Sequence, residues 1–358
     1  MLSYPSCKYL FFWSPREHST VFIMSSRSDT KNSPDDQPRQ KASGFHSSIS
    51  RDPGAEFPPE KGRYYLYLSL SCPFAHRTNI TRSLKGLEDI IELVVLDHDL
   101  GPDGWVFSGK DGTAEKDPLY GFTHLRDLYH KADPNYTGRA TVPVLWDRKK
   151  ETIVSNESAD IMRMFFTEFD DLLPPERRES AHPLGGYLPP ASNPLRAEID
   201  KMIEWMNDQL NTGVYKAGLA ETQAVYEEHV YRVFEALDRV EAHLASPNHQ
   251  PYLFGKYITE ADIRLFPTIV RFDVAYFAVF RCNLRMIRYE YPNIHKWLRR
   301  LYWDESEATR GVFKKTSAVS IFKRLYTIPY LRNHGFQGEI IIPAGPIPEI
   351  LPLDENDR

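Results

Sequence analysis

The chain has 358 residues, a formal net charge of -5, an apolar fraction of 41% and a charged fraction of 26%. This composition is that of an ordinary folded protein and predicts two domains with extra segments. The negative charge argues against nucleic-acid binding, and no apolar run is long enough to span a membrane. The cysteines Cys7, Cys72 and Cys282 are too few and too far apart for a disulfide framework or a paired zinc site. A reducing compartment, with the cytoplasm as the expected location, fits this cysteine usage.

The beginning of the chain contains little that predicts regular structure. Residues 1–43 join a short aromatic opening to a stretch rich in Ser, Asp, Lys, Gln and Pro, which predicts a disordered or mis-started extension. A true start at Met24 would account for the aromatic opening. Residues 44–62 are expected to form an ordered but irregular lead-in.

Residues 63–170 carry the pattern of a thioredoxin-like domain. Runs of strand length and composition cover 64–70, 90–96, 142–146 and 151–154. Helices are expected after Cys72-Pro73, near 123–131 and after Asn156-Glu157-Ser158. A long loop with several glycines covers 97–140, and loops of that length are usually functional or disordered. The order βαβ followed by ββα predicts an α/β thioredoxin-like fold.

The rest of the chain is expected to be helical. The proline-rich residues 171–193 predict a linker, and residues 194–334 have helical periodicity throughout, which predicts an all-α domain. Thr259-Glu260-Ala261-Asp262 has the form of a capping box that starts a central helix reaching about Phe280. Residues 335–358 predict an extended tail, whose isoleucines we expect to lie against an apolar surface.

Cys72 is placed where the first strand gives way to a helix. A helix N-terminus offers free backbone N–H groups and the positive end of the helix dipole. These features predict a lowered thiol pKa and a reactive thiolate near neutral pH. The alternative is that Cys72 is a small buried hydrophobic residue, which is the commonest role of a free cysteine.

Several motifs, in this order, are typical of one family. They are Cys72-Pro73-Phe74-Ala75-His76-Arg77, Gly104-Trp105-Val106-Phe107, the segment 136–147, Asn156-Glu157-Ser158-Ala159-Asp160-Ile161, Asn211-Thr212-Gly213-Val214-Tyr215-Lys216, and Ala261-Asp262-Ile263-Arg264-Leu265-Phe266 running into Arg271-Phe272-Asp273. With them the chain resembles the Xi class of glutathione transferases, the glutathionyl-hydroquinone reductases, from about residue 53 to residue 348. It departs from that class at Phe74, where a Trp is usual, and after Tyr326, where a second tyrosine is missing.

The resemblance implies a thioredoxin-like N-terminal domain, an all-α C-terminal domain and a homodimer. It also implies that Cys72 accepts glutathione as a mixed disulfide. Because Ala75 stands where a second cysteine would allow an internal disulfide, a second glutathione must resolve that intermediate. The expected activity removes glutathione from glutathionyl-hydroquinones, with thioltransferase and dehydroascorbate reductase side activity. Glutathione is the expected co-substrate, and no metal is expected.

The family pattern also assigns roles to individual residues. The expected glutathione-binding residues are Phe74, Trp105, Arg139, Val142, Pro143, Glu157 and Ser158. Pro143 is expected in the cis form, which exposes the backbone of Val142 to an extended peptide. Glu157 and Ser158 at a helix N-terminus suit the γ-glutamyl amine and carboxylate. Tyr215, Tyr276 and Tyr326 are the expected catalytic partners of Cys72 on the hydroquinone side.

Two other functions remain open on the sequence. One is an omega-like glutathione transferase or thiol oxidoreductase whose substrate is not a quinol. The other is a catalytically idle transferase-like module used for binding. Cys72, the Glu157-Ser158 pair and Val142-Pro143 argue against an idle module, because a scaffold needs none of them.

Overall fold

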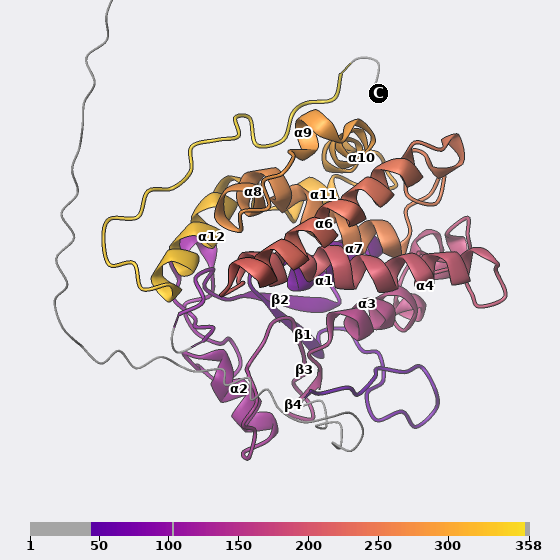
Figure 1. The fold of residues 1–358 in the computed structure, drawn as a ribbon. Helices are drawn as coiled ribbons and strands as arrows, with labels where there is room; N and C mark the ends of the chain where they lie inside the picture. The colour runs from indigo at the N-terminus through magenta and orange to yellow at the C-terminus, as the bar shows by residue number, and fades with distance from the viewer. Residues whose placement is uncertain (1–43, 102–103, 355–358) are drawn as a thin grey trace, which may run out of the picture. The chain divides into compact units, whose positions relative to one another are not determined.

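The computed structural model describes residues 44–101 and 104–354. The predictions for residues 1–43, including a start at Met24 and the state of Cys7, lie outside the described residues. Residues 44–62 contain no helix or strand apart from a single bridge between His46 and Ser155. An α/β half is followed by an all-α half, so the predicted fold class is confirmed (Figure 1).

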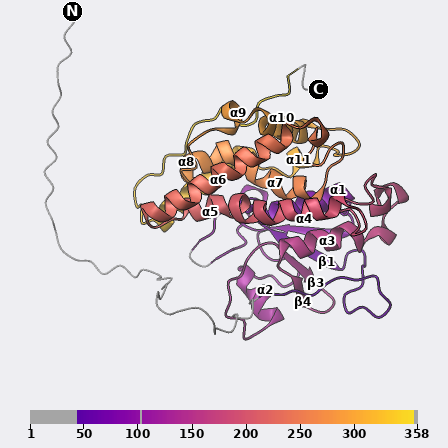
Figure 2. The same cartoon turned by 45° about the vertical axis from the view of Figure 1, so that its right-hand side comes forward.

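A mixed four-stranded sheet forms the centre of the first half. The strands are β1 (Tyr64–Leu68), β2 (Ile91–Val95), β3 (Val144–Asp147) and β4 (Thr152–Ser155). In the order β2-β1-β3-β4, β1 and β2 are parallel, β3 is antiparallel to β1, and β4 is antiparallel to β3. Helices α1 (Pro73–Lys85) and α3 (Ser158–Thr167) cover one face, and α2 (Leu125–Ala132) lies on the other (Figures 1 and 2).

Local sequence explains why α1 begins and ends where it does. Pro73 occupies the first helical position, where its missing N–H costs nothing, and Cys72 is the N-cap. Gly86 ends the helix in a left-handed conformation with φ of 73°, which glycine adopts without steric cost. Because β1 ends at Leu68 and α1 begins at Pro73, Cys72 lies in the short turn between the strand and the helix.

The second half is a helical assembly that packs against α1. Its helices are α4 (Leu195–Met206), α5 (Gly213–Gly218), α6 (Gln223–Leu244), α7 (Glu260–Arg271), α8 (Phe277–Val279), α9 (Ile287–Glu290), α10 (Pro292–Trp303), α11 (Val312–Lys315) and α12 (Val319–Asn333). Helix α7 is buried along its whole length and contacts α1, α4, α10 and α12. Three short 3-10 turns lie in the linker before α4, at Asp170–Leu172, Pro175–Arg177 and Glu179–Ala181.

Two π-helical turns interrupt the helices of this half. One, Asn207–Asn211, follows α4, and the other, Phe272–Tyr276, separates α7 from α8. The expected helix from 261 to about Phe280 is therefore present, but the wider turn changes the direction of its side chains partway along. π-Turns of this kind are frequent at functional sites.

The expected apolar contact of the C-terminal tail is present at Ile350 but not along the whole tail. Ile350 is 8% exposed and belongs to the hydrophobic core of the helical half, whereas Ile341 is 83% exposed and Ile347 is 79% exposed. The tail runs along the helical half without helix or strand (Figure 1). Polar contacts also hold its backbone: Lys323 donates to the carbonyls of Ala344 and Pro346, and Trp303 donates to that of Leu351. Among the described residues, no helix is both long and apolar enough to cross a bilayer.

The predicted capping box is present at the start of α7, and Asp262 is its centre. This fully buried carboxylate accepts hydrogen bonds from the N–H and hydroxyl of Thr259, from the N–H of Leu253 and from the indole of Trp297, each at 2.9 Å. Losing it would leave several buried donors without an acceptor. We therefore expect Asp262→Ala to lower the free energy of unfolding by about 4 kcal/mol, measured by urea denaturation.

The matched control is Asp208→Ala, which removes a carboxylate that is 62% exposed and whose ion pair, among the described residues, is with Lys216. A surface pair of this kind contributes at most about 1 kcal/mol. Equal losses in the two variants would show that the buried network around Asp262 does not hold α7 in place.

Candidate active site

Cys72 lies at the edge of the sheet where β1 ends and α1 begins. Its Sγ accepts a hydrogen bond from the N–H of Ala75 at 3.5 Å and lies 3.6 Å from the carbonyl oxygen of Val142. The side chain is only partly exposed and packs against the core of the α/β half. Because the Val142 carbonyl can only accept, the thiol directs its hydrogen at that oxygen.

The prediction of a lowered thiol pKa is wrong for this structure. Surrounding protein atoms disfavour the charged thiolate, and this desolvation raises the pKa of Cys72 above its ordinary value. The N–H groups of Ala75 and Phe74 and the charges of Arg271 and Arg77 act in the opposite direction, and each lowers the pKa in part. The helix N-terminus thus has the predicted effect, but desolvation outweighs it.

The three tyrosines predicted as partners of Cys72 come together from three helical segments. The hydroxyl oxygens of Tyr215 and Tyr326 are 2.9 Å apart, those of Tyr276 and Tyr326 are 3.2 Å apart, and that of Tyr326 donates to the carbonyl of Ser71 at 3.0 Å. Because Tyr326 gives its proton to Ser71, it must accept from its two neighbours. Desolvation raises the pKa of all three hydroxyls, so they remain protonated donors.

Arg271, on α7, is an important residue of the site to which the sequence assigned no role. Its guanidinium is fully buried and donates to the carbonyl of Leu70, to Nδ1 of His76 and to the carbonyl of Pro267, at 2.9 to 3.0 Å. It also lowers the pKa of Cys72 and of Tyr326. No local pattern in the sequence indicates its burial, because α7 also carries the charged residues Glu260, Asp262 and Arg264.

His76 takes part in this contact between the two halves and does not face solvent. Since arginine only donates, Nδ1 of His76 must accept from Arg271, so Nε2 carries the proton and faces the Thr316 hydroxyl at 3.0 Å. Burial and the Arg271 charge hold the pKa of His76 well below its ordinary value. His76 is therefore a neutral link between the halves.

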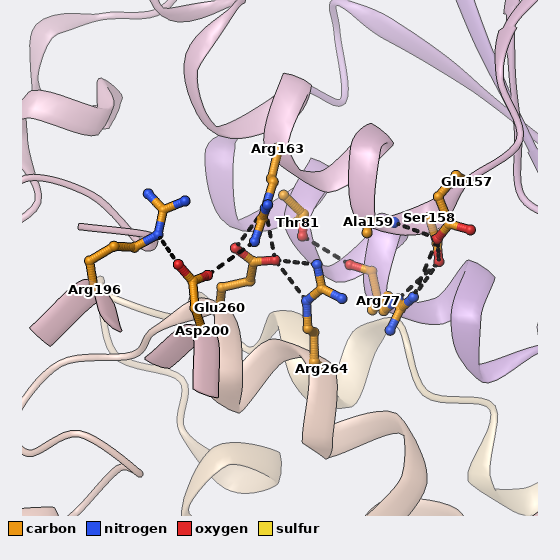
Figure 3. A network of polar contacts seen from close by, with 10 residues as sticks. All are labelled: Arg77, Thr81, Glu157, Ser158, Ala159, Arg163, Arg196, Asp200, Glu260 and Arg264. Carbon is orange, nitrogen blue, oxygen red and sulfur yellow. Dashed lines mark hydrogen bonds and ion pairs between the residues drawn. The ribbon is translucent and has the colours of Figure 1, made fainter. Parts of the chain in front are cut away.

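Glu157 and Ser158 lie at the N-terminus of α3, as predicted. The residue that caps the helix is Glu157 and not Ser158. Glu157 is the N-cap and accepts from the N–H of Ala159 at 3.1 Å, and Ser158 is the first helical residue. The Ser158 hydroxyl accepts from both Nε and Nη2 of the buried Arg77, at 3.0 and 2.5 Å (Figure 3).

Five further residues were predicted to bind glutathione. Pro143 follows a cis peptide bond with Val142, as the resemblance implies, and the Val142 carbonyl faces Cys72. Phe74 packs near Tyr215, with ring centroids 6.4 Å apart. Trp105 packs against the core of the α/β half, and Arg139 is exposed, with its carbonyl accepting from Tyr136. Within the described chain, neither Trp105 nor Arg139 hydrogen-bonds to Cys72 or to the tyrosines.

Metal ligation has no support in the described part of the chain. Within residues 44–101 and 104–354, no group of three or more His, Cys, Asp or Glu side chains lies close enough to hold a metal ion. The reactive and charged groups that the structure brings together at the candidate site are one thiol, three phenols and the buried arginines beside them.

Comparison with known proteins agrees with this architecture. Residues 71–167 match the glutathione S-transferase N-terminal domain family, and residues 223–300 match the glutathione S-transferase C-terminal domain family. The chain is 43% identical to glutathione S-transferase omega-like 2 of Schizosaccharomyces pombe, over 89% of this chain and 96% of that protein. The chain belongs to the glutathione transferase superfamily.

Two other comparisons describe this glutathione transferase more closely. It is 46% identical to the glutathionyl-hydroquinone reductase YqjG of Escherichia coli, over 74% of this chain and 78% of that protein. The Xi-class glutathione transferase of Phanerochaete chrysosporium superposes with a TM-score of 0.75 at 45% identity, covering 87% of this chain and 98% of that one. The predicted membership of the superfamily and its likeness to the Xi class are confirmed.

The raised thiol pKa predicts how Cys72 reacts with an alkylating reagent. Because only the thiolate is nucleophilic, the rate of alkylation by iodoacetamide should still be increasing with pH above about pH 8.5, the ordinary pKa of cysteine. The measurement is peptide mass spectrometry after timed exposure to the reagent between about pH 6 and about pH 10. A rate that levels off below about pH 7 would instead indicate a lowered pKa.

Cys282 provides an internal control in the same experiment. It is fully buried, and desolvation raises its pKa to about 12. Its peptide should remain unmodified at every pH at which the fold is intact, which distinguishes reaction of the folded protein from reaction of unfolded chains.

Proposed function

We propose that this glutathione transferase is a glutathione-dependent reductase that removes glutathione from glutathionyl-hydroquinones. The observation that carries the proposal is the cluster formed by Tyr215, Tyr276 and Tyr326, whose hydroxyls meet beside the segment that carries Cys72. Three protonated phenols next to one thiol suit a substrate that has both a sulfur to attack and a phenolic ring to hold. The name of the Escherichia coli relative supports the same substrate class.

Glutathione would bind at the edge of the sheet where β1 ends, between Cys72, the Val142-Pro143 segment and the N-terminus of α3. A solved relative, the Xi glutathione transferase ECM4 of Saccharomyces cerevisiae, was determined in complex with glutathione and superposes with a TM-score of 0.77 at 36% identity, over 86% of this chain and 99% of that one. In our proposal Ser158 and the N-terminus of α3 hold the γ-glutamyl carboxylate, and Glu157 holds its amine. The backbone of Val142 pairs with the peptide, Pro143 shapes that segment, and Phe74, Trp105 and Arg139 surround the rest of the molecule.

The proposed reaction has two exchange steps. In the first, the Cys72 thiolate attacks the glutathione sulfur, a disulfide forms between Cys72 and glutathione, and the carbon–sulfur bond to the ring breaks. The ring carbon takes that electron pair and a proton, which gives the free hydroquinone. In the second, the thiolate of another glutathione attacks the mixed disulfide, releases glutathione disulfide and restores Cys72. Across both steps the hydroquinone adduct is reduced and two glutathione sulfurs are oxidised.

The raised pKa of Cys72 is compatible with this role. It lowers the thiolate population near neutral pH, but a thiolate of higher pKa is intrinsically the stronger nucleophile. The hydroxyls of Tyr215, Tyr276 and Tyr326 remain protonated because burial raises their pKa values, so a proton donor is available in the same pH range. The activity is therefore expected to increase with pH on the alkaline side of neutrality.

The working form in our proposal is a cytoplasmic homodimer with no metal. Thioltransferase and dehydroascorbate reductase activity should accompany the main reaction, because both use the same thiolate. Relatives named omega-like keep open a thiol oxidoreductase with a substrate other than a quinol. The assays below separate these alternatives.

Turnover of a glutathionyl-hydroquinone with excess glutathione is the direct test. Cys72→Ser should lower kcat/KM by roughly a thousandfold or more, because the hydroxyl cannot form the mixed disulfide. Mass spectrometry of the natural protein after reaction with substrate alone should show one glutathionyl group on Cys72. A natural protein that reduces a small disulfide but leaves the hydroquinone adduct intact would favour the omega-like oxidoreductase, and full activity of Cys72→Ser would exclude the thiolate mechanism.

The tyrosine cluster predicts a second, selective effect. Tyr326→Phe removes the hydroxyl that links its two neighbours to Ser71, and Tyr215→Phe removes one that donates to it. Either change should lower kcat for the hydroquinone adduct by roughly a hundredfold, because proton transfer to the ring is impaired. Reduction of a small disulfide, which needs no ring proton, should change by less than about threefold. Equal losses in both assays would contradict a role of the tyrosines specific to the quinol.

A further inference from the structure

The neighbours of the Ser158 hydroxyl determine whether it donates or accepts its remaining hydrogen bond. Its oxygen accepts two hydrogen bonds, both from the guanidinium of Arg77. A hydroxyl has two acceptor positions and one proton, so both acceptor positions are occupied and only the proton remains to be given. In this structure that proton points at Oε1 of Glu157, 3.3 Å away. Ser158 is therefore an obligate donor.

Arg77 itself is a buried charge without close compensation. It is 4% exposed, and its nearest ion-pair partner is Glu157 at 3.8 Å, whose side chain is 46% exposed. Its guanidinium lies over the ring of Phe74, with 5.0 Å to the centroid. The neighbouring arginine of α7, Arg264, is already paired with Glu260, which also contacts Arg163 (Figure 3). The network therefore leaves the Arg77 charge available to an anion at the N-terminus of α3.

Arg77 also lies on the same helix as the thiol. Cys72 is the N-cap of α1, and Arg77 belongs to its first turns. The Arg77 charge is one of the influences that lower the pKa of Cys72. Desolvation lowers the pKa of Arg77 itself to about 9, while the charges of Glu157, Glu260 and Cys72 favour its charged form. One guanidinium thus binds Ser158 of the predicted glutathione site and belongs to the helix that begins at the predicted nucleophile.

We propose that Arg77 is a positioning residue with two effects: it makes Ser158 an obligate donor for the glutathione carboxylate, and its buried charge favours the Cys72 thiolate. The proposal rests on the proposed function for the identity of the bound molecule. It differs from a purely structural role for Arg77 because it couples two measurable quantities, the affinity for glutathione and the reactivity of the thiol.

Other charged and titratable groups face the same two centres and must be kept constant. Arg77 is faced by Glu157 before α3 and by Glu260 and Arg264 on α7. The thiol is faced by Arg271 on α7, Tyr215 on α5 and Tyr326 on α12. None of these is changed in the test.

The test compares Arg77→Met with Arg82→Met. Arg82 is a buried arginine of the same helix, and in the described chain its guanidinium donates to the carbonyls of Ile91 and Glu88 and not to Ser158. Arg77→Met should weaken glutathione binding by about tenfold or more, because a donor to a charged group is no longer held in place. It should also lower the alkylation rate of Cys72 at a fixed pH by about threefold. Arg82→Met should change both quantities by less than about twofold.

Two more variants separate the effects and cover a failure of Arg77→Met to fold. Arg77→Lys keeps the charge but not the planar fork, so it should preserve alkylation of Cys72 and still weaken glutathione binding. Ser158→Ala should weaken glutathione binding and leave alkylation unchanged. Binding is measured by calorimetric titration with reduced glutathione, and alkylation by peptide mass spectrometry.

The outcomes that would overturn the proposal are specific. Equal effects of Arg77→Met and Arg82→Met would reduce Arg77 to a structural residue, and loss of alkylation in Ser158→Ala would contradict a charge effect of Arg77 on the thiol. If the natural protein did not bind glutathione at all, the proposed function would fail. The alkylation rates would then still decide whether Arg77 acts on Cys72.

Discussion

The buried guanidinium of Arg271 is the contact on which the site depends. It joins α7 of the helical half to the carbonyl of Leu70 and to His76, on either side of Cys72. A buried charge is costly where its donors lack acceptors. Here the carbonyl at the turn and the neutral imidazole accept from the guanidinium, while Nε has no partner among the described residues. The turn that carries the thiol is therefore fixed by the other half of the molecule. Because the helical half also carries the tyrosines, the same contact sets the distance between the nucleophile and its partners.

The tyrosines reach this position through irregular helix geometry. Tyr276 is the last residue of the π-helical turn Phe272–Tyr276, and the other π-helical turn, Asn207–Asn211, ends shortly before Tyr215. A π-turn inserts one residue into the helical repeat and so rotates the side chains that follow it. Tyr326 comes from the regular α12 and donates to the carbonyl of Ser71. The three hydroxyls come from separate segments, and the π-helical turns in two of these segments help to orient their tyrosines toward the common position.

Most of the fold could be predicted from sequence, but the buried charges could not. The strand that runs into Cys72 and the capping box at Asp262 depend on neighbours in sequence, and both were predicted correctly. The contacts of Arg77 and Arg271 depend on packing between distant segments, and an arginine is usually exposed, so no local pattern indicated burial. The tail was predicted only in part. Ile350 makes the expected apolar contact, whereas side-chain donors such as Lys323 bind the backbone before it and Ile341 stays exposed.

The electrostatics of the site raise the nucleophilicity of the Cys72 thiolate and lower the fraction of Cys72 that is ionised. Two buried guanidiniums and the start of α1 lower the pKa of Cys72, and desolvation still keeps it above the ordinary value. In the proposed reaction the leaving group is a ring carbon, which departs poorly unless it is protonated. A strong thiolate and an acid that stays protonated are then both required, and the same desolvation provides both, because it raises the pKa values of the thiol and of the phenols together. A more polar site would give more thiolate but a weaker nucleophile.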